Sequence, residues 1–160
     1  MVSRFVAVLI VLLALNSCKK DQIDDSTQTN MALANSLRIS ASTILVGNDS
    51  LFLTTYVWRD FMPLIGTDGS GLYCSNQLNF KDGLPIPLGL KLKTQYVINE
   101  NEIWANQHPD IYNEQALIRG VISNGPKWGP DIFVDVVCEF EIDNHTYRII
   151  AGHQKISSTY

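Results

Sequence analysis

The sequence predicts an all-β fold, a small antiparallel sandwich of the immunoglobulin-like type, with an open β-barrel as the alternative. Seven or eight segments rich in β-branched and aromatic residues recur about every ten residues between turn signals. One of them, 132–142, alternates apolar and polar residues as a half-buried strand does. The sequence has no long apolar pattern of helical period, and only 108–115 could form a turn of helix.

The predicted strands follow one another with short connections. The segment 51–59 (LFLTTYVWR) is dense in residues that favour strands, and the turn sequence 47–50 (GNDS) links it back to 37–46 as a hairpin. Pro85 and Pro87 lie in a loop, because proline cannot donate to a β-ladder. The strands that we predict before residue 124 are 37–46, 51–59, 72–80, 90–98, 102–105 and 114–123.

The clearest strand signal is the segment 132–142. Its turn, Asp143-Asn144, consists of residues that tolerate a positive φ, and it leads into a last strand over 145–151. The apolar residues of 132–142 fall on one face, which we expect to face the core: Ile132, Val134, Val136, Cys138, Phe140 and Ile142.

The N-terminus carries a separate signal. Arg4 precedes eleven apolar residues, 5–15, which as a helix would span roughly 16 Å, about half the hydrocarbon core of a bilayer. The segment is therefore too short for a membrane span. A positive charge, a short apolar run and a small residue before the cleavage point are typical of a secretory signal.

Residues 15–18 (LNSC) resemble the lipobox of bacterial lipoproteins. The resemblance implies cleavage before Cys18, a lipid on the Cys18 sulfur and acylation of the new amino terminus. More than one acyl chain anchors a protein stably, so the expected partner is a lipid bilayer. We expect the outer membrane, with the domain facing the periplasm or the cell surface. The alternative is an ordinary cleaved signal in which Cys18 is incidental.

The chain is thus expected to have three parts. Residues 1–17 are the signal peptide, 18–36 are the lipidated Cys18 and a flexible polar tether, and 37–160 are the β-domain. Removal of the signal leaves 143 residues and, with Arg4 lost, changes the net charge from −4 to about −5. An acidic chain does not attract phosphates, which excludes nucleic acid as the expected partner.

Two cysteines, Cys74 and Cys138, lie in predicted strands 64 residues apart. In an oxidising compartment they could form a disulfide, and the spacing is similar to that of immunoglobulin domains. The alternative is a pair of buried, unreactive thiols.

Signals for catalysis or metal binding are weak. His108, His145 and His153 are scattered, and neither a metal-ligand spacing, a nucleophile elbow nor a phosphate-binding glycine loop occurs in the sequence. We therefore predict no cofactor, no metal and no enzymatic activity, and a small hydrolase is the least favoured function.

Two aromatic segments remain as candidate binding residues. Trp58 and Arg59 end a predicted strand on opposite faces, and Lys127 and Trp128 lie in a loop made rigid by glycine and proline. These four residues could form a carbohydrate-binding surface, with exposed Trp and Arg contacting a sugar. We favour the alternative, in which both tryptophans plug the open ends of the sandwich and bond backbone groups through their indole N–H.

Several segments, among them 58–63, 102–104, 125–130 with 134–137, and 146–156, resemble a family of small exported bacterial proteins of uncharacterised function. The resemblance covers most of 37–160 and implies an exported β-rich domain without assigning an activity. The function that we expect is a membrane-anchored, non-enzymatic binding or structural module of the cell envelope, with an envelope protein or a glycan as its partner.

Overall fold

The computed structural model describes residues 27–160 except 64, 66, 88, 115 and 116. Almost all of the regular structure is β, so the predicted all-β class is confirmed. The elements are β1 (Thr27–Thr29), α1 (Met31–Arg38), β2 (Thr43–Val46), β3 (Asp49–Asp60), β4 (Leu72–Phe80), β5 (Lys91–Asn99), β6 (Glu102–Asn106), β7 (Asp110–Glu114), β8 (Leu117–Gly125), β9 (Phe133–Ile142) and β10 (His145–Thr159).

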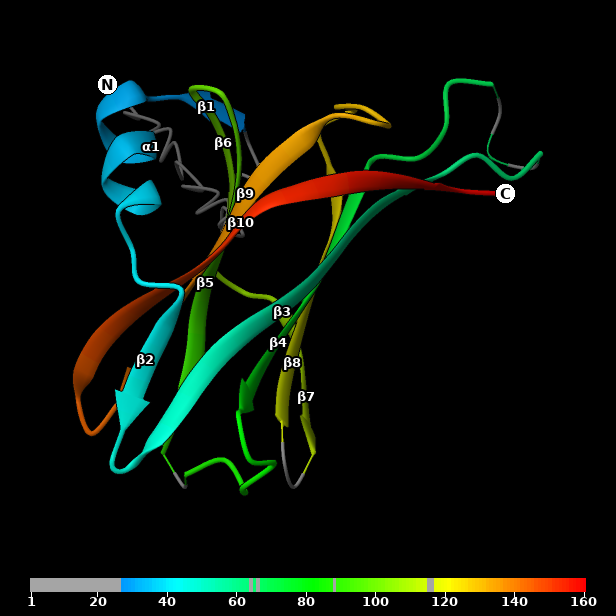
Figure 1. Ribbon diagram of the computed structural model, residues 1–160. Helices are drawn as coiled ribbons and strands as arrows, with labels where there is room; N and C mark the ends of the chain where they lie inside the picture. Colours follow the sequence, from blue (N-terminus) through cyan, green and yellow to red (C-terminus); the bar gives the residue numbers. More distant parts are fainter. Residues whose placement is uncertain (1–26, 64, 66, 88, 115–116) are drawn as a thin grey trace, which may run out of the picture.

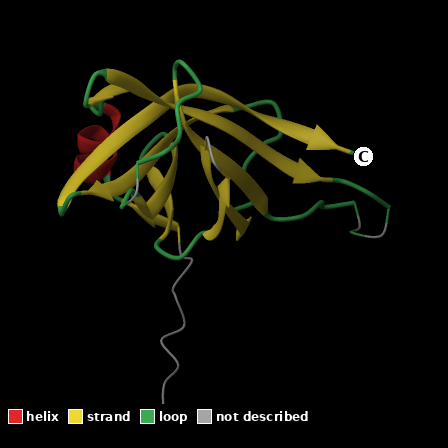
Figure 2. Cartoon of the chain, turned by 90° about the horizontal axis from the view of Figure 1, so that it is seen from below, coloured by secondary structure: helices red, strands yellow, loops and turns green. Residues whose placement is uncertain are grey.

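The strands form one continuous sheet in the order β1-β6-β5-β9-β10-β3-β4-β8-β7, with β2 paired to β3 as a branch. The sheet curls into an open half-barrel, as Figures 1 and 2 show from two directions. The immunoglobulin-like sandwich is not confirmed, because the strands belong to one sheet instead of two. The open barrel is the closer of the two sequence-based descriptions.

Strand β10 joins the two halves of this sheet. Its first part pairs antiparallel with β9, and its last four residues, Ile156 to Thr159, pair in parallel with β3. The register shifts between Ala151 and Gln154, where His153 adopts a positive φ of 56°. The strand predicted over 145–151 is therefore eight residues longer than expected, and one strand pair is parallel where an antiparallel fold was predicted.

The main core lies inside the curl and is built from the inward-facing residues that alternate along the strands. Strand β9 confirms the predicted core face, since its inward residues from Val134 to Ile142 are buried, whereas Ile132 lies outside the strand and is partly exposed. Strands β3 and β4 alternate in the same way. The largest fully buried side chain is Trp104 of β6.

A second, smaller core lies outside the curl, beneath α1. The Asn30 side chain caps this helix by accepting a hydrogen bond from the Leu33 N–H. Ala34 and Leu37 are completely buried against the outer face of β5, β6 and β9. This packing explains why Val137, on the outward face of β9, is also buried.

Two expectations differ from the structure. Residues 27–36, expected to be part of a flexible tether, contain β1 and most of α1, so regular structure is already present before residue 37. The segment 108–115, expected to allow a turn of helix, contains the edge strand β7. Pairing with β8 decides its conformation, because the chain there gains a full antiparallel ladder.

Two glycines of β8 let the halves of the sheet approach each other inside the curl. A Cβ at Gly120 would lie 2.0 Å from Nε2 of Gln95 on β5, and a Cβ at Gly125 would lie 2.7 Å from the indole ring of Trp104. The side chains of Gln95 and Trp104 therefore pack directly against the β8 backbone, and one sheet fills its own interior.

The substitution Gly125→Ala is expected to lower the free energy of unfolding by about 1–3 kcal/mol, because the buried indole of Trp104 has no room to move aside. Urea unfolding measures the change. The matched control is Gly152→Ala, where the new Cβ would make only an ordinary contact of 3.5 Å with Asp135. Equal effects of the two substitutions would contradict the tight packing at Gly125.

Candidate functional site

The four residues singled out as a binding surface lie near one end of the sheet but do not form one surface. As predicted, Trp58 and Arg59 lie on opposite faces of β3. Trp58 is on the outer face and half-buried, whereas Arg59 points into the curl and is only 4% exposed. Arg59 is therefore unavailable as a partner for a ligand on Trp58.

The Arg59 guanidinium donates to four backbone carbonyls of two loops. Nε donates to Ser70 at 2.9 Å and Nη2 to Asp68 at 2.6 Å, while Nη1 donates to Gly129 at 2.7 Å and Lys127 at 3.2 Å. The guanidinium carbon also lies 5.0 Å from the centre of the Phe61 ring. This residue joins loops that are about 60 residues apart in the sequence.

Lys127 and Trp128 make further contacts near the same junction. Lys127 forms an ion pair with Asp68 of the other loop, and this hydrogen-bonded contact lowers the pKa of the Asp68 carboxyl. Trp128 is half-buried against the core, as the plug interpretation requires. Its indole N–H, however, donates to the carboxylate of Glu102 at 2.8 Å and not to the backbone. The contacts of Arg59, Lys127 and Trp128 are those of residues that hold loops together.

The substitution Arg59→Lys is expected to lower the free energy of unfolding by about 3 kcal/mol, because a lysine cannot reach four carbonyls from two loops. Chemical unfolding checks this. Lys127→Ala, which removes an exposed ion pair, serves as the control and should change stability little. A loss in Arg59→Lys as small as that in the control would show that the charge, which lysine keeps, and not the fork of donors, holds the loops.

The exposed outer face of β3 and β4 carries a stack of three aromatic rings, which we call the aromatic stack: Tyr56, Trp58 and Tyr73. The Tyr56 and Trp58 rings have centroids 5.1 Å apart and planes 20° apart, and the Trp58 and Tyr73 rings are 5.2 Å and 14° apart. Tyr56 is 50% exposed, and the other two rings are half-buried. The spacing of Tyr56 and Trp58 was visible in the sequence, but Tyr73 joins them only through the pairing of β3 with β4.

The residues next to the aromatic stack are mainly uncharged and polar. Ser75 is paired with Tyr56, Ser157 with Trp58, and Thr54 precedes Tyr56 by two residues on the same face. Farther along the face, the Gln77 amide oxygen accepts hydrogen bonds from Nε and Nη2 of Arg119 at 2.9 and 3.0 Å. This face therefore combines aromatic rings with hydroxyl and amide groups.

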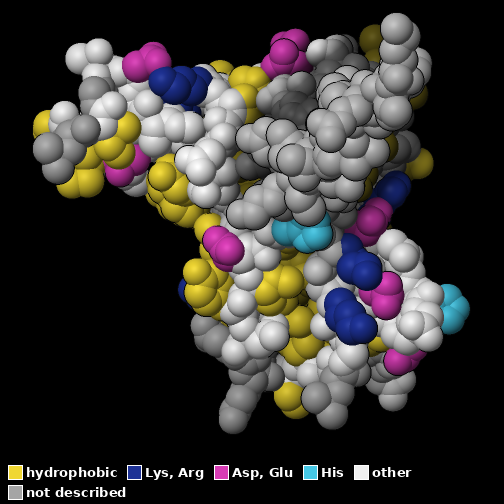
Figure 3. Space-filling model, turned by 180° about the vertical axis from the view of Figure 1, so that it is seen from behind, with side chains coloured by type: hydrophobic (Ala, Val, Ile, Leu, Met, Phe, Trp, Pro, Cys, Tyr) yellow, Lys and Arg dark blue, Asp and Glu magenta, His cyan; other side chains and the backbone are white. Residues whose placement is uncertain are grey.

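The outer face of the other half of the sheet is different, because it carries ion pairs. Lys93 pairs with Glu141 at 3.2 Å, and Arg148 pairs with Glu139 at 2.8 Å. Figure 3, which shows the molecule from behind, has basic and acidic side chains next to one another on that side. The aromatic stack is thus a local feature, distinct from the charged surface elsewhere.

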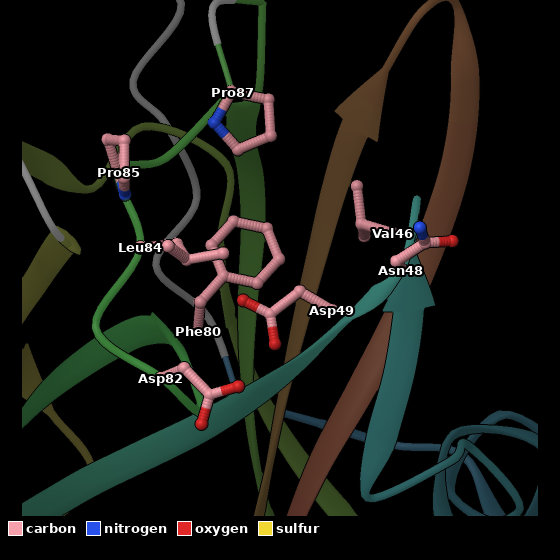
Figure 4. A pocket seen from close by; sticks show the side chains of 8 residues that line it. All are labelled: Val46, Asn48, Asp49, Phe80, Asp82, Leu84, Pro85 and Pro87. Carbon is pink, nitrogen blue, oxygen red and sulfur yellow. The ribbon is translucent and has the colours of Figure 1, made fainter.

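An open pocket of about 300 Å³ lies at the other end of β3 from Arg59 (Figure 4). Phe80 and Leu84 form its apolar part, and the Asp49 carboxylate points toward the Phe80 ring. One Asp49 oxygen accepts the Ser50 N–H at 2.8 Å. The lining contains two carboxylates but no serine, cysteine or histidine; its residues are Val46, Asn48, Asp49, Phe80, Asp82, Leu84, Pro85 and Pro87.

The three histidines lie apart and in different surroundings. His145 Nδ1 lies 2.9 Å from the Asp143 carbonyl in the turn, and the His153 ring stacks on Phe133 with centroids 4.1 Å apart. The His108 backbone N–H donates to Asn106. Within the described part of the chain, the acidic, histidine and cysteine side chains form no group of three able to hold a metal ion.

Cys74 and Cys138 are free thiols in the structure, both completely buried inside the curl. Burial raises the pKa of the Cys74 thiol to about 11, although contacts with Thr55 and Asn76 lower it. Burial also raises the pKa of the Cys138 thiol well above its ordinary value, and the proximity of Cys74 adds to the effect. Neither thiol is activated as a nucleophile.

Both thiols of the folded protein are expected to resist iodoacetamide at pH 8, and peptide mass mapping should find both alkylated after unfolding without reductant. The folded state keeps the Cys74 proton to a higher pH than the unfolded state, so its contribution to stability is complete below pH 9.0 and declines toward about 11. Failure of unfolded protein to react until a reductant is added would reveal a disulfide instead.

The fold and its surface define an all-β protein with an exposed aromatic face. No family model matches the chain, and comparisons with curated proteins and with solved structures give no significant match. The predicted signal and the lipidation residue Cys18 lie outside the described residues. None of the helices in the described segments is long and apolar enough to cross a membrane.

Proposed function

We propose that the protein is a non-enzymatic binding module of the cell envelope, exported by the signal 1–17 and anchored in a membrane by lipid on Cys18. The sequence LNSC at 15–18 supports the anchor. Support for binding comes chiefly from the aromatic stack. Three aromatic rings on the outer face of a sheet, with Tyr56 half exposed, contribute little to the core, and exposed aromatic groups are typical of binding surfaces.

The framework around the stack also supports a binding role. Arg59 and its four carbonyl contacts fix the end of β3 just beyond Trp58, so the rings stand on a rigid strand. A rigid aromatic surface loses little conformational entropy when it binds. The histidines and thiols, by contrast, are dispersed or buried, which argues against a small hydrolase.

The substitution Cys18→Ser tests the anchor. Cells that express the full chain with a metabolic alkyne-fatty-acid label are expected to show a labelled protein in the membrane fraction, and the Cys18→Ser variant should lose both the label and the membrane association. Cys74→Ser is the control, because this thiol is buried and lies in the folded domain. A wild-type chain that is exported without label would contradict the lipid anchor and leave an ordinary secretory signal.

A further inference from the structure

We propose that the aromatic stack is a carbohydrate-binding site that takes a neutral, β-1,4-linked hexopyranose chain. The inference rests on the proposed binding function and names its ligand class. It replaces the surface expected from the sequence, since of those four residues only Trp58 belongs to the stack.

Neighbouring rings of the stack cover one another only in part, and Tyr56 is the most exposed of the three. Parallel rings in contact lie roughly 3.5–4 Å apart, so centroid distances of 5.1 and 5.2 Å mean that neighbouring rings are displaced sideways and overlap only in part. Each ring therefore leaves part of its face uncovered. The three partly overlapping rings form a row that crosses from β3 to β4.

Such a row matches the flat C–H face of a pyranose. The negative face of an aromatic ring attracts the weakly positive C–H groups of a sugar. A β-1,4-linked chain is extended and presents these flat faces one after another along a ribbon. Three rings in a row fit an oligosaccharide better than a single sugar.

The neighbours of the rings supply the groups that sugar hydroxyls need. Ser75, Ser157 and Thr54 border the stack with hydroxyls, each of which can both donate and accept. The two charged side chains nearest the stack along β3 and β10 already have partners. The Asp60 carboxylate accepts the Met62 N–H at 2.9 Å, and Lys155, two residues before Ser157 on β10, pairs with Asp131 at 2.7 Å. A border of hydroxyls and already paired charges favours a neutral glycan over an acidic one and over a charged peptide.

The test uses the full chain in detergent, with cellohexaose and chitohexaose as probes and the α-linked maltohexaose as the comparison. Titration calorimetry should detect binding of at least one β-linked probe, and Tyr56→Ala should weaken it about tenfold by removing one stacking face. Tyr56→Phe should retain the affinity, because the ring and not the hydroxyl makes the contact.

Two controls separate binding from folding. Tyr112→Ala removes a tyrosine of nearly equal exposure, 54%, on β7 of the same sheet, and it should leave the affinity unchanged. Trp58→Phe keeps a stacked ring, so this variant should still bind while losing the ligand-dependent change in tryptophan fluorescence. Near-ultraviolet circular dichroism verifies that each variant is folded.

Several results would overturn the glycan proposal. They are absence of binding to both β-linked probes, equal binding of maltohexaose, or equal weakening by Tyr56→Ala and Tyr112→Ala. A photo-crosslinker at Ser75 that joins a discrete protein in cells, without glycan binding in vitro, would also reject it in favour of a protein partner. The anchor proposal is tested separately, because none of these results affects the fatty-acid label on Cys18. Release of shorter sugars from the probes would contradict the proposed non-enzymatic function.

Discussion

The buried guanidinium of Arg59 is the constraint on which this end of the molecule depends. A charge removed from water is stable only when other dipoles surround it, and here four backbone carbonyls from two distant loops take that place. The need to satisfy one cation therefore fixes the path of residues 68–70 and 127–129. Because Trp58 precedes Arg59 on the same strand, the position of the exposed rings follows from the same interaction.

The curl of the sheet solves a packing problem that most all-β domains solve with two sheets. One sheet must cover its own inner face, so its two halves have to approach closely. Gly120 and Gly125 make this approach possible by admitting Gln95 and Trp104 against the β8 backbone. The two halves of the outer face differ. Helix α1 covers part of the β5, β6 and β9 side, whereas the β3 and β4 side carries the aromatic stack, which no helix among the described residues covers.

Local patterns were sufficient to predict part of this fold. The alternation in β9, the 143–144 turn and the hairpin that ends in β3 depend on neighbouring residues, and the sequence predicts all three. The helix α1 was missed because eight residues are too few for a clear helical period, although the Asn30 cap and the spacing of Leu33, Ala34 and Leu37 were visible. The aromatic stack and the Arg59 contacts could not be predicted, since Tyr73 and the 127–129 loop reach β3 only through the tertiary pairing.

The place of β10 has a consequence for how the domain forms. The last of the described strands, β10, occupies the middle of the sheet, between β9 and β3, and among the described residues it is the hydrogen-bonded link between the two halves. Until its final residues are available, β3, β4 and β8 on one side and β5, β6 and β9 on the other are separate ribbons with unpaired edges. Long-range pairing of this kind delays folding. A chain threaded through a membrane from its N-terminus would thus be unable to close this sheet until β10 has passed.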